Sequence, residues 1–159
     1  MADSTLEVLD AVVAKLSELV TGGEGAVTTV TDFLQGYIDP EELPFVAVLV
    51  ATEDESLRGE RNSAEATWGR KFVDYDVQVE VRDLGFLDSQ RADTRAFYAL
   101  IDTIRLKLAA DPSLGGLMRR FGLDIQVRFT EPRATEETVH YAASLTTRGQ
   151  QAVSRAPLG

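Results

Sequence analysis

Residues 71–82 read KFVDYDVQVEVR. A valine or tyrosine stands at every odd position from Val73 to Val81, and a polar residue stands at every even position from Asp74 to Arg82. Successive side chains of a β-strand point to opposite faces, so this period of two is typical of a strand with one face packed and the other wet. The stretch therefore predicts a half-buried strand of an antiparallel sheet.

Further strands are predicted on both sides of this stretch. Phe45 to Ala51 is an unbroken apolar run of strand length, which predicts a strand buried on both faces. Residues 26–31 are rich in β-branched side chains and predict a short strand. Alternating apolar residues from Phe121 to Phe129 and from Val139 to Leu145 predict a closing pair of strands.

Two segments have the period of a helix. In the first, Ser4 and Glu7 have the spacing of a capping box. Its predicted core stripe is Leu6, Leu9, Val13, Leu16 and Val20. The second helix begins near Asp88 or Ser89 and ends before Asp111-Pro112. Its predicted core stripe is Phe97, Leu100, Ile101, Ile104 and Leu108.

The order helix, strands, helix, strands predicts one α+β domain over residues 1–147. We expect two layers: a mainly antiparallel sheet of four to five strands, and two helices on one of its faces. The other face is polar. Residues 52–69, TEDESLRGERNSAEATWG, lack a sustained period and predict a long charged loop. Residues 148–159 are polar and predict a flexible C-terminal tail.

Composition excludes several classes of protein. The 159 residues include no cysteine, which excludes disulfides and thiol nucleophiles. The net charge of −10 argues against binding nucleic acid or anionic membranes through bulk attraction. No stretch has the length of a membrane span and the first residues lack a signal peptide, so we expect a protein made and used in the cytosol.

The charge is unevenly distributed along the chain. Residues 1–80 hold 17 acidic and 5 basic residues, whereas residues 81–159 hold 9 and 11. This polarity would allow subunits to associate head to tail. The simpler interpretation is an excess of solvated carboxylates.

No pattern predicts catalysis, so we assign no catalytic, cofactor-binding or metal residues. The sequence has no phosphate-binding loop, dinucleotide fingerprint or nucleophile elbow. His140 is the only histidine and the only start for an enzyme site. Asp74, Asp76 and Glu80 share one strand face, where with Asp124 they could bind a hard cation. A solvated strand face is the favoured interpretation.

Trp68 is the only tryptophan, and arginines surround it in sequence. Tryptophan and arginine are enriched where proteins contact one another. We therefore predict a subunit interface at Arg58, Arg61, Trp68 and Arg70. The alternative is that Trp68 folds back over its own core.

The order and spacing of these segments resemble the tail-terminator, or tail-completion, proteins of tailed bacteriophages. The resemblance covers roughly residues 4–147. It rests on the N-terminal helix, the strand entry Leu43–Val48, the alternating strand Tyr75–Val81, and the second helix with its ending at Asp111–Gly116.

The resemblance implies a structural virion protein and not an enzyme, with no cofactor. Such proteins form a ring, commonly of six subunits, that caps the head-proximal end of the tail tube, stops its polymerisation and joins it to the neck. The implied partners are the tail tube protein and a neck or connector protein, in a virion assembled in the host cytoplasm. DNA would pass through without specific binding, and Asp74, Asp76 and Glu80 would give the lumen or rim an acidic face.

Three other interpretations stay open. A head–tail connector or head-closure protein of the neck would have the same general character. A small α+β enzyme or ligand-binding domain would use a pocket near His140. A dimerising adaptor would use the face or edge of the sheet.

Overall fold

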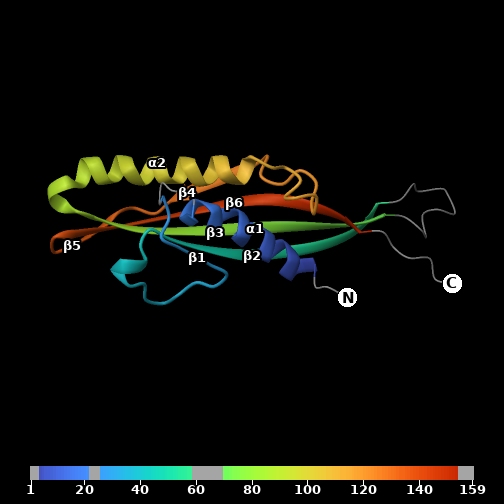
Figure 1. Ribbon diagram of the computed structural model, residues 1–159, viewed down its shortest axis with the longest axis horizontal. Coiled ribbons are helices and arrows are strands. Elements are labelled where there is room, and N and C mark those ends of the chain that lie inside the picture. The colour runs from blue at the N-terminus through green and yellow to red at the C-terminus, as the bar shows by residue number, and fades with distance from the viewer. Residues whose placement is uncertain (1–3, 22–25, 59–69, 154–159) are drawn as a thin grey trace.

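The computed structural model describes residues 4–21, 26–58 and 70–153. The predicted order of helix, strands, helix, strands is confirmed (Figure 1). The elements are α1 (Ser4–Thr21), β1 (Thr29–Thr31), the 3-10 turn η1 (Pro40–Glu42), β2 (Phe45–Arg58), β3 (Arg70–Phe86), the 3-10 turn η3 (Leu87–Ser89), α2 (Gln90–Ala109), β4 (Ile125–Phe129), β5 (Arg133–Thr135) and β6 (Thr138–Val153).

The strands form one sheet in the order β1-β2-β3-β6-β4, and β5 also pairs with β6. β1 and β2 are parallel, and the other pairs are antiparallel. The predicted α+β class is confirmed, although the sheet has six strands and not four to five. The unpredicted strand is β5, which is only three residues long and has no apolar alternation to reveal it.

The core lies between one face of the sheet and the two helices. The odd-numbered residues of β3 from Val73 to Val81 are buried there, as the alternation predicts. On α2 the predicted stripe is the buried one: Phe97, Leu100, Ile101, Ile104 and Leu108. Lys107 of α2 pairs with Glu18 of α1, so the helices lie beside each other. In Figure 1, α2 runs along one side of the sheet.

The predicted stripe of α1 is rotated from the observed one. Val8, Val12 and Leu16 are fully buried, whereas Leu6 is 51% exposed. The other predicted residues, Leu9, Val13 and Val20, are partly buried against the core. The valines and leucines of α1 form one broad apolar side that includes both the predicted and the observed stripe, so its own pattern does not decide which part of that side faces the sheet. Contact with β1 and β2 decides it. The side chain of Ser4, half of the predicted capping box, lies outside the described residues.

The predicted loop and tail boundaries are wrong at two strand ends. β2 continues through residues 52–58, which the sequence assigns to the loop, and pairs there with Arg70–Asp76. β6 continues through residues 148–153, which the sequence assigns to the tail, and pairs there with Lys71–Asp76. Pairing with β3 satisfies backbone groups where side chains show no strand period. The remaining loop residues 59–69 and tail residues 154–159 lie outside the described part.

β4 begins later than predicted, at Ile125 and not at Phe121. The chain turns at Gly122, which has φ +72°. A side chain at this position would place its β-carbon 2.3 Å from the carbonyl oxygen of Leu108. Only glycine fits this close turn against the end of α2. Phe121 is consequently buried in the core, whereas Leu123 is 63% exposed.

The connection between β1 and β2 covers one end of the face opposite the helices (Figure 1). Phe45 and Ala47 are fully buried, yet they pair with Arg82 and Glu80 of the polar side of β3. The predicted burial on both faces is thereby confirmed from Phe45 to Val48, whereas Leu49 and Val50 are partly exposed and Ala51 is exposed. Among the described residues, no helix is long and apolar enough to cross a membrane.

Candidate functional surface: the polar face of the sheet

The face of the sheet away from the helices carries hydrophilic side chains on β3, β6 and β4, whereas β2 contributes Thr52 beside the apolar Phe45, Ala47 and Leu49. The even-numbered residues of β3 pair with residues of β2 on one side and β6 on the other, and the same residues of β6 pair with β4. We call this surface the polar face. Its members are Thr52, Asp74, Asp76, Gln78, Glu80, Arg82, Gln126, Arg128, Ser144, Thr146, Arg148 and Gln150.

Asp76 joins three strands of the polar face. Thr52 of β2 donates its hydroxyl to Asp76 Oδ2 at 2.9 Å, and Arg148 of β6 donates Nε–H to Asp76 Oδ1 at 2.9 Å. Two residues along β3, Asp74 accepts a hydrogen bond of 2.9 Å from the Gln150 side-chain amide. Hydrogen bonds between strands, and not burial, therefore fix the positions of these carboxylates.

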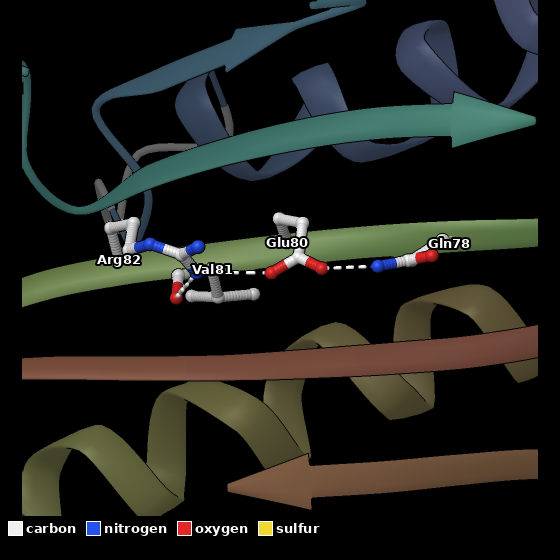
Figure 2. Close-up of polar contacts among 4 residues, drawn as sticks. All are labelled: Gln78, Glu80, Val81 and Arg82. Atoms are coloured by element: carbon white, nitrogen blue, oxygen red, sulfur yellow. Dashed lines mark hydrogen bonds and ion pairs between the residues drawn. The ribbon is translucent and has the colours of Figure 1, made fainter. Parts of the chain in front are cut away.

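Glu80 is held by its neighbours on the same strand, as Figure 2 shows. Arg82 Nη1 donates to Glu80 Oε2 at 3.0 Å and to the Val81 carbonyl at 3.2 Å, while the Gln78 amide donates to Glu80 Oε1. The Glu80 side chain is only 12% exposed, so its partners supply the hydrogen bonds that water would otherwise give.

The polar face is balanced in charge over its described residues. Asp74, Asp76 and Glu80 lie together on it with Arg82, Arg128 and Arg148. Arg119, which bridges to Gln150 and lies over the ring of Phe72, adds a fourth arginine, and Asp124, which lines a depression with Asp76 and Arg148, adds a fourth carboxylate. The acidic face expected from the sequence is therefore neutralised locally. Arg148 is absent from the sequence-based site because the residues around it, TTRGQQ, have no apolar alternation to mark them as a strand.

A groove lies at the end of the polar face, beneath residues 34–43. Its volume is about 700 Å³, and its lining includes Tyr37, Arg82, Arg133 and His140. Tyr37 is 76% exposed. His140 thus lies near two arginines.

Across the described segments, no group of three or more histidine, aspartate or glutamate side chains is placed to hold a metal ion. Asp124 lines a separate depression with Asp76 and Arg148.

Two carboxylates lie near the junction of β3 and α2. Asp93 accepts hydrogen bonds from the Ser89 hydroxyl at 2.6 Å and from the Phe86 amide at 2.9 Å, and these bonds lower the pKa of Asp93. Burial raises the pKa of Asp83, against the opposing effect of the hydrogen bond from Leu84 N–H. Ser89 occupies the predicted cap position, but its hydroxyl donates to Asp93 and caps no helix amide.

The predicted interface residues fall at or beyond the ends of β2 and β3. Arg58 and Arg70 are register partners in the backbone, at the last described position of each strand. Their side chains, and all of Arg61 and Trp68, lie outside the described residues. The interface at Arg58, Arg61, Trp68 and Arg70 stays a prediction.

No protein-family model matches this chain, and no curated protein matches it. The α+β fold, the polar face and the resemblance in sequence are therefore what remain to indicate a function.

Proposed function

We propose that this chain is a structural subunit of a tailed-bacteriophage virion: a tail terminator that forms a ring on the head-proximal end of the tail tube. In this role it stops tube polymerisation and joins the tube to the neck. The observation that carries the proposal is the polar face, which the two helices leave uncovered and which hydrogen bonds hold in a fixed arrangement.

This surface is suited to line a channel for DNA. A duplex is retained mainly by cations that neutralise its phosphates. On the polar face, Arg82 and Arg148 are each paired with a carboxylate of the same surface, whereas Arg128 has no ion-pair partner among the described residues. Arginines that are already paired offer less attraction to a passing phosphate. The chain's net charge of −10 adds a weak repulsion at longer range.

The resemblance in sequence supplies the expected partners and number of copies. We propose a ring of six subunits that contacts the tail tube protein on one side and a neck or connector protein on the other. DNA passes through without specific binding, and the protein needs no cofactor. Assembly takes place in the host cytoplasm.

The test is to purify the chain, measure its mass by light scattering, and image it with tubes made from the tail tube protein encoded beside its gene. We expect ring-shaped particles on one end of each tube and a stop to tube growth. A chain that stays monomeric or dimeric with tubes present, and leaves them growing, would count against the terminator role.

Two alternatives predict other results. A head–tail connector or head-closure protein would bind the neck assembly and leave free tubes untouched. A small enzyme or ligand-binding domain would use the groove beneath residues 34–43, the observation that favours this class. His140→Ala would then abolish the function, whereas a terminator would keep its tube-capping activity.

A further inference from the structure

The groove beneath residues 34–43 has an apolar floor, although it lies at the end of the polar face. Along β3 the polar residues of this face end at Arg82, and Leu84 is the next residue of the same row. On β6 the register partner of Arg82 is Ala142. Leu84 and Ala142 both line the groove. The small side chain of Ala142 leaves room above this floor.

The roof of the groove leaves apolar side chains open to solvent. Leu34 is 48% exposed and Tyr37 is 76% exposed, and both line the groove together with Ile38 and Leu43. A contiguous apolar surface bordered by polar residues is typical of a ligand-binding groove. The volume of about 700 Å³ also lies within the range of small-molecule sites, about 300–1,000 Å³.

An arginine and a histidine stand together on one wall of the groove. Arg133 of β5 and His140 of β6 both line it and are register partners, so their side chains lie on the same face of the sheet. His140 is also the register partner of Leu84, which places the pair beside the apolar floor. Within residues 4–21, 26–58 and 70–153, neither Arg133 nor His140 forms an ion pair, whereas Arg82, the third basic residue of the lining, is paired with Glu80.

The two carboxylates of the lining leave Arg133 available. Asp83 alternates to the helix side of the sheet with its register partner Tyr141, which stacks on Phe97 of α2. Glu131 is exposed in the turn between β4 and β5, and no ion pair joins it to Arg133. An anion in the groove therefore meets one unpaired guanidinium and one solvated carboxylate. This balance suits a single negative charge better than the nearly two charges of a phosphate monoester.

We propose that the groove binds a small apolar carboxylate. Its apolar body lies between the floor at Leu84 and Ala142 and the roof at Tyr37. Its carboxylate pairs with the Arg133 guanidinium and accepts a hydrogen bond from His140, since guanidinium and carboxylate groups form strong, often bidentate, hydrogen bonds. The site occupies only one end of the polar face and does not rest on the proposed ring function, so tube capping neither supports nor opposes it.

The test uses naphthylacetate as the probe, titrated into the isotope-labelled full chain and followed by NMR of the backbone amides. We expect a saturating response that gathers at β5, at the facing part of β6 and at residues 34–43. Naphthylacetamide has the same apolar body without the charge, and should bind about tenfold more weakly because it loses the charge-assisted hydrogen bonds. Acetate has the charge without the body and should not saturate over the same concentrations.

Four variants separate the charge from the apolar body. Arg133→Met should weaken naphthylacetate about tenfold and leave naphthylacetamide unchanged. Arg128→Met is the matched control, because Arg128 is also unpaired on the polar face but does not line the groove, and it should change neither affinity. Glu131→Gln removes a like charge and should strengthen naphthylacetate alone. Ala142→Leu fills the space above the floor and should abolish the binding of both compounds.

Absence of saturation by naphthylacetate, or a response outside the groove, would overturn the proposal. Equal affinity for the native chain and Arg133→Met, or an equal loss in Arg133→Met and Arg128→Met, would overturn it too. Tighter binding of naphthylmethylphosphonate than of naphthylacetate would refute the carboxylate class. Arg133 and Arg128 are both exposed, so we expect both variants to fold, which urea titration checks. Arg133→Gln repeats the measurement with a second side chain and should show the same loss.

Discussion

Arg148 and Asp76 are direct partners across the β3–β6 pair, and the guanidinium Nε donates to the carboxylate at 2.9 Å. The Arg148 side chain is 81% exposed and that of Asp76 is 26% exposed, so water screens the pair. Thr52 donates to the other oxygen of the same carboxylate, which extends the contact to β2. The pair therefore neutralises charge on the polar face more than it stabilises the fold.

A double-mutant cycle on Asp76→Ala and Arg148→Ala tests this view. We expect a coupling of about 0.2–1 kcal/mol in the free energy of unfolding, measured by urea titration, because exposed ion pairs contribute little. The Asp102–Arg105 pair on α2, with 3.1 Å between Asp102 Oδ1 and Arg105 Nη2, is the matched control, and we expect about 0.3–0.5 kcal/mol there. A coupling well above 1 kcal/mol for Asp76–Arg148 would make the pair structural.

Asp93 should make the fold sensitive to acid. Hydrogen bonds from Ser89 and Phe86 hold the pKa of Asp93 below its value of about 4 in an unfolded chain. The folded state then binds fewer protons than the unfolded state, so this stabilisation is present above pH 4 and is lost as pH falls through the folded pKa. We expect the native chain to lose more stability between pH 5 and pH 2 than Asp93→Asn, followed by urea titration at each pH.

Asp83→Asn gives the contrasting pH dependence. Burial raises the pKa of Asp83, so the carboxylate destabilises the fold at neutral pH and does so less as pH falls through the folded pKa. We expect Asp83→Asn to be more stable than the native chain at pH 7, with the advantage shrinking toward pH 4. If Asp93→Asn and Asp83→Asn both raised, or both lowered, the free energy of unfolding at pH 7, these assignments of the two pKa shifts would be contradicted.

The sequence predicts elements well where a side-chain period and the tertiary contacts agree. The stripe from Phe97 to Leu108 and the alternation from Val73 to Val81 are buried as predicted. It fails where partners elsewhere in the chain decide the outcome. The ends of β2 and β6 are strands because β3 pairs with them, and the buried side of α1 follows from its contact with the sheet. Residues 34–43 have no sequence pattern that predicts their position over the polar face. The groove that they form there was therefore not predictable.

The candidate site was predictable to the same extent. The period of two places Asp74, Asp76 and Glu80 on one face, and the register confirms that placement. Their neutralisation was not predictable, because Arg148 stands in a stretch without apolar alternation. Local pattern thus predicts which face a residue occupies, whereas long-range register decides its partners.

Gly149→Ala tests the packing between β6 and the segment that follows α2. A β-carbon on Gly149 would stand 2.3 Å from Met118 Cε and 3.0 Å from Phe121 Cδ2. Both neighbours are buried, so the new methyl group forces them to move. We expect a loss of about 1–3 kcal/mol in the free energy of unfolding, the range of overpacked cores.

Gly36→Ala is the matched control for this change, because its β-carbon would meet no atom within 4 Å. We expect an effect within about 0.5 kcal/mol there. The double variant Gly149→Ala, Met118→Ala should regain part of the loss relative to the sum of the single changes. Equal destabilisation by Gly149→Ala and Gly36→Ala would mean that Met118 does not pack against β6.

Thr147→Val should stabilise the protein. Thr147 is 1% exposed, between Val77 of β3 and Ile125 of β4, and its hydroxyl has no hydrogen-bond partner among the described residues. An unsatisfied buried polar group costs about 1–3 kcal/mol. Valine has the same shape without the hydroxyl, so we expect the free energy of unfolding to rise by about 1 kcal/mol, measured by urea titration. Thr147→Ser keeps the hydroxyl and loses a methyl group, and should lower stability by about 1 kcal/mol. A loss of stability in Thr147→Val would instead show that a buried water satisfies the hydroxyl.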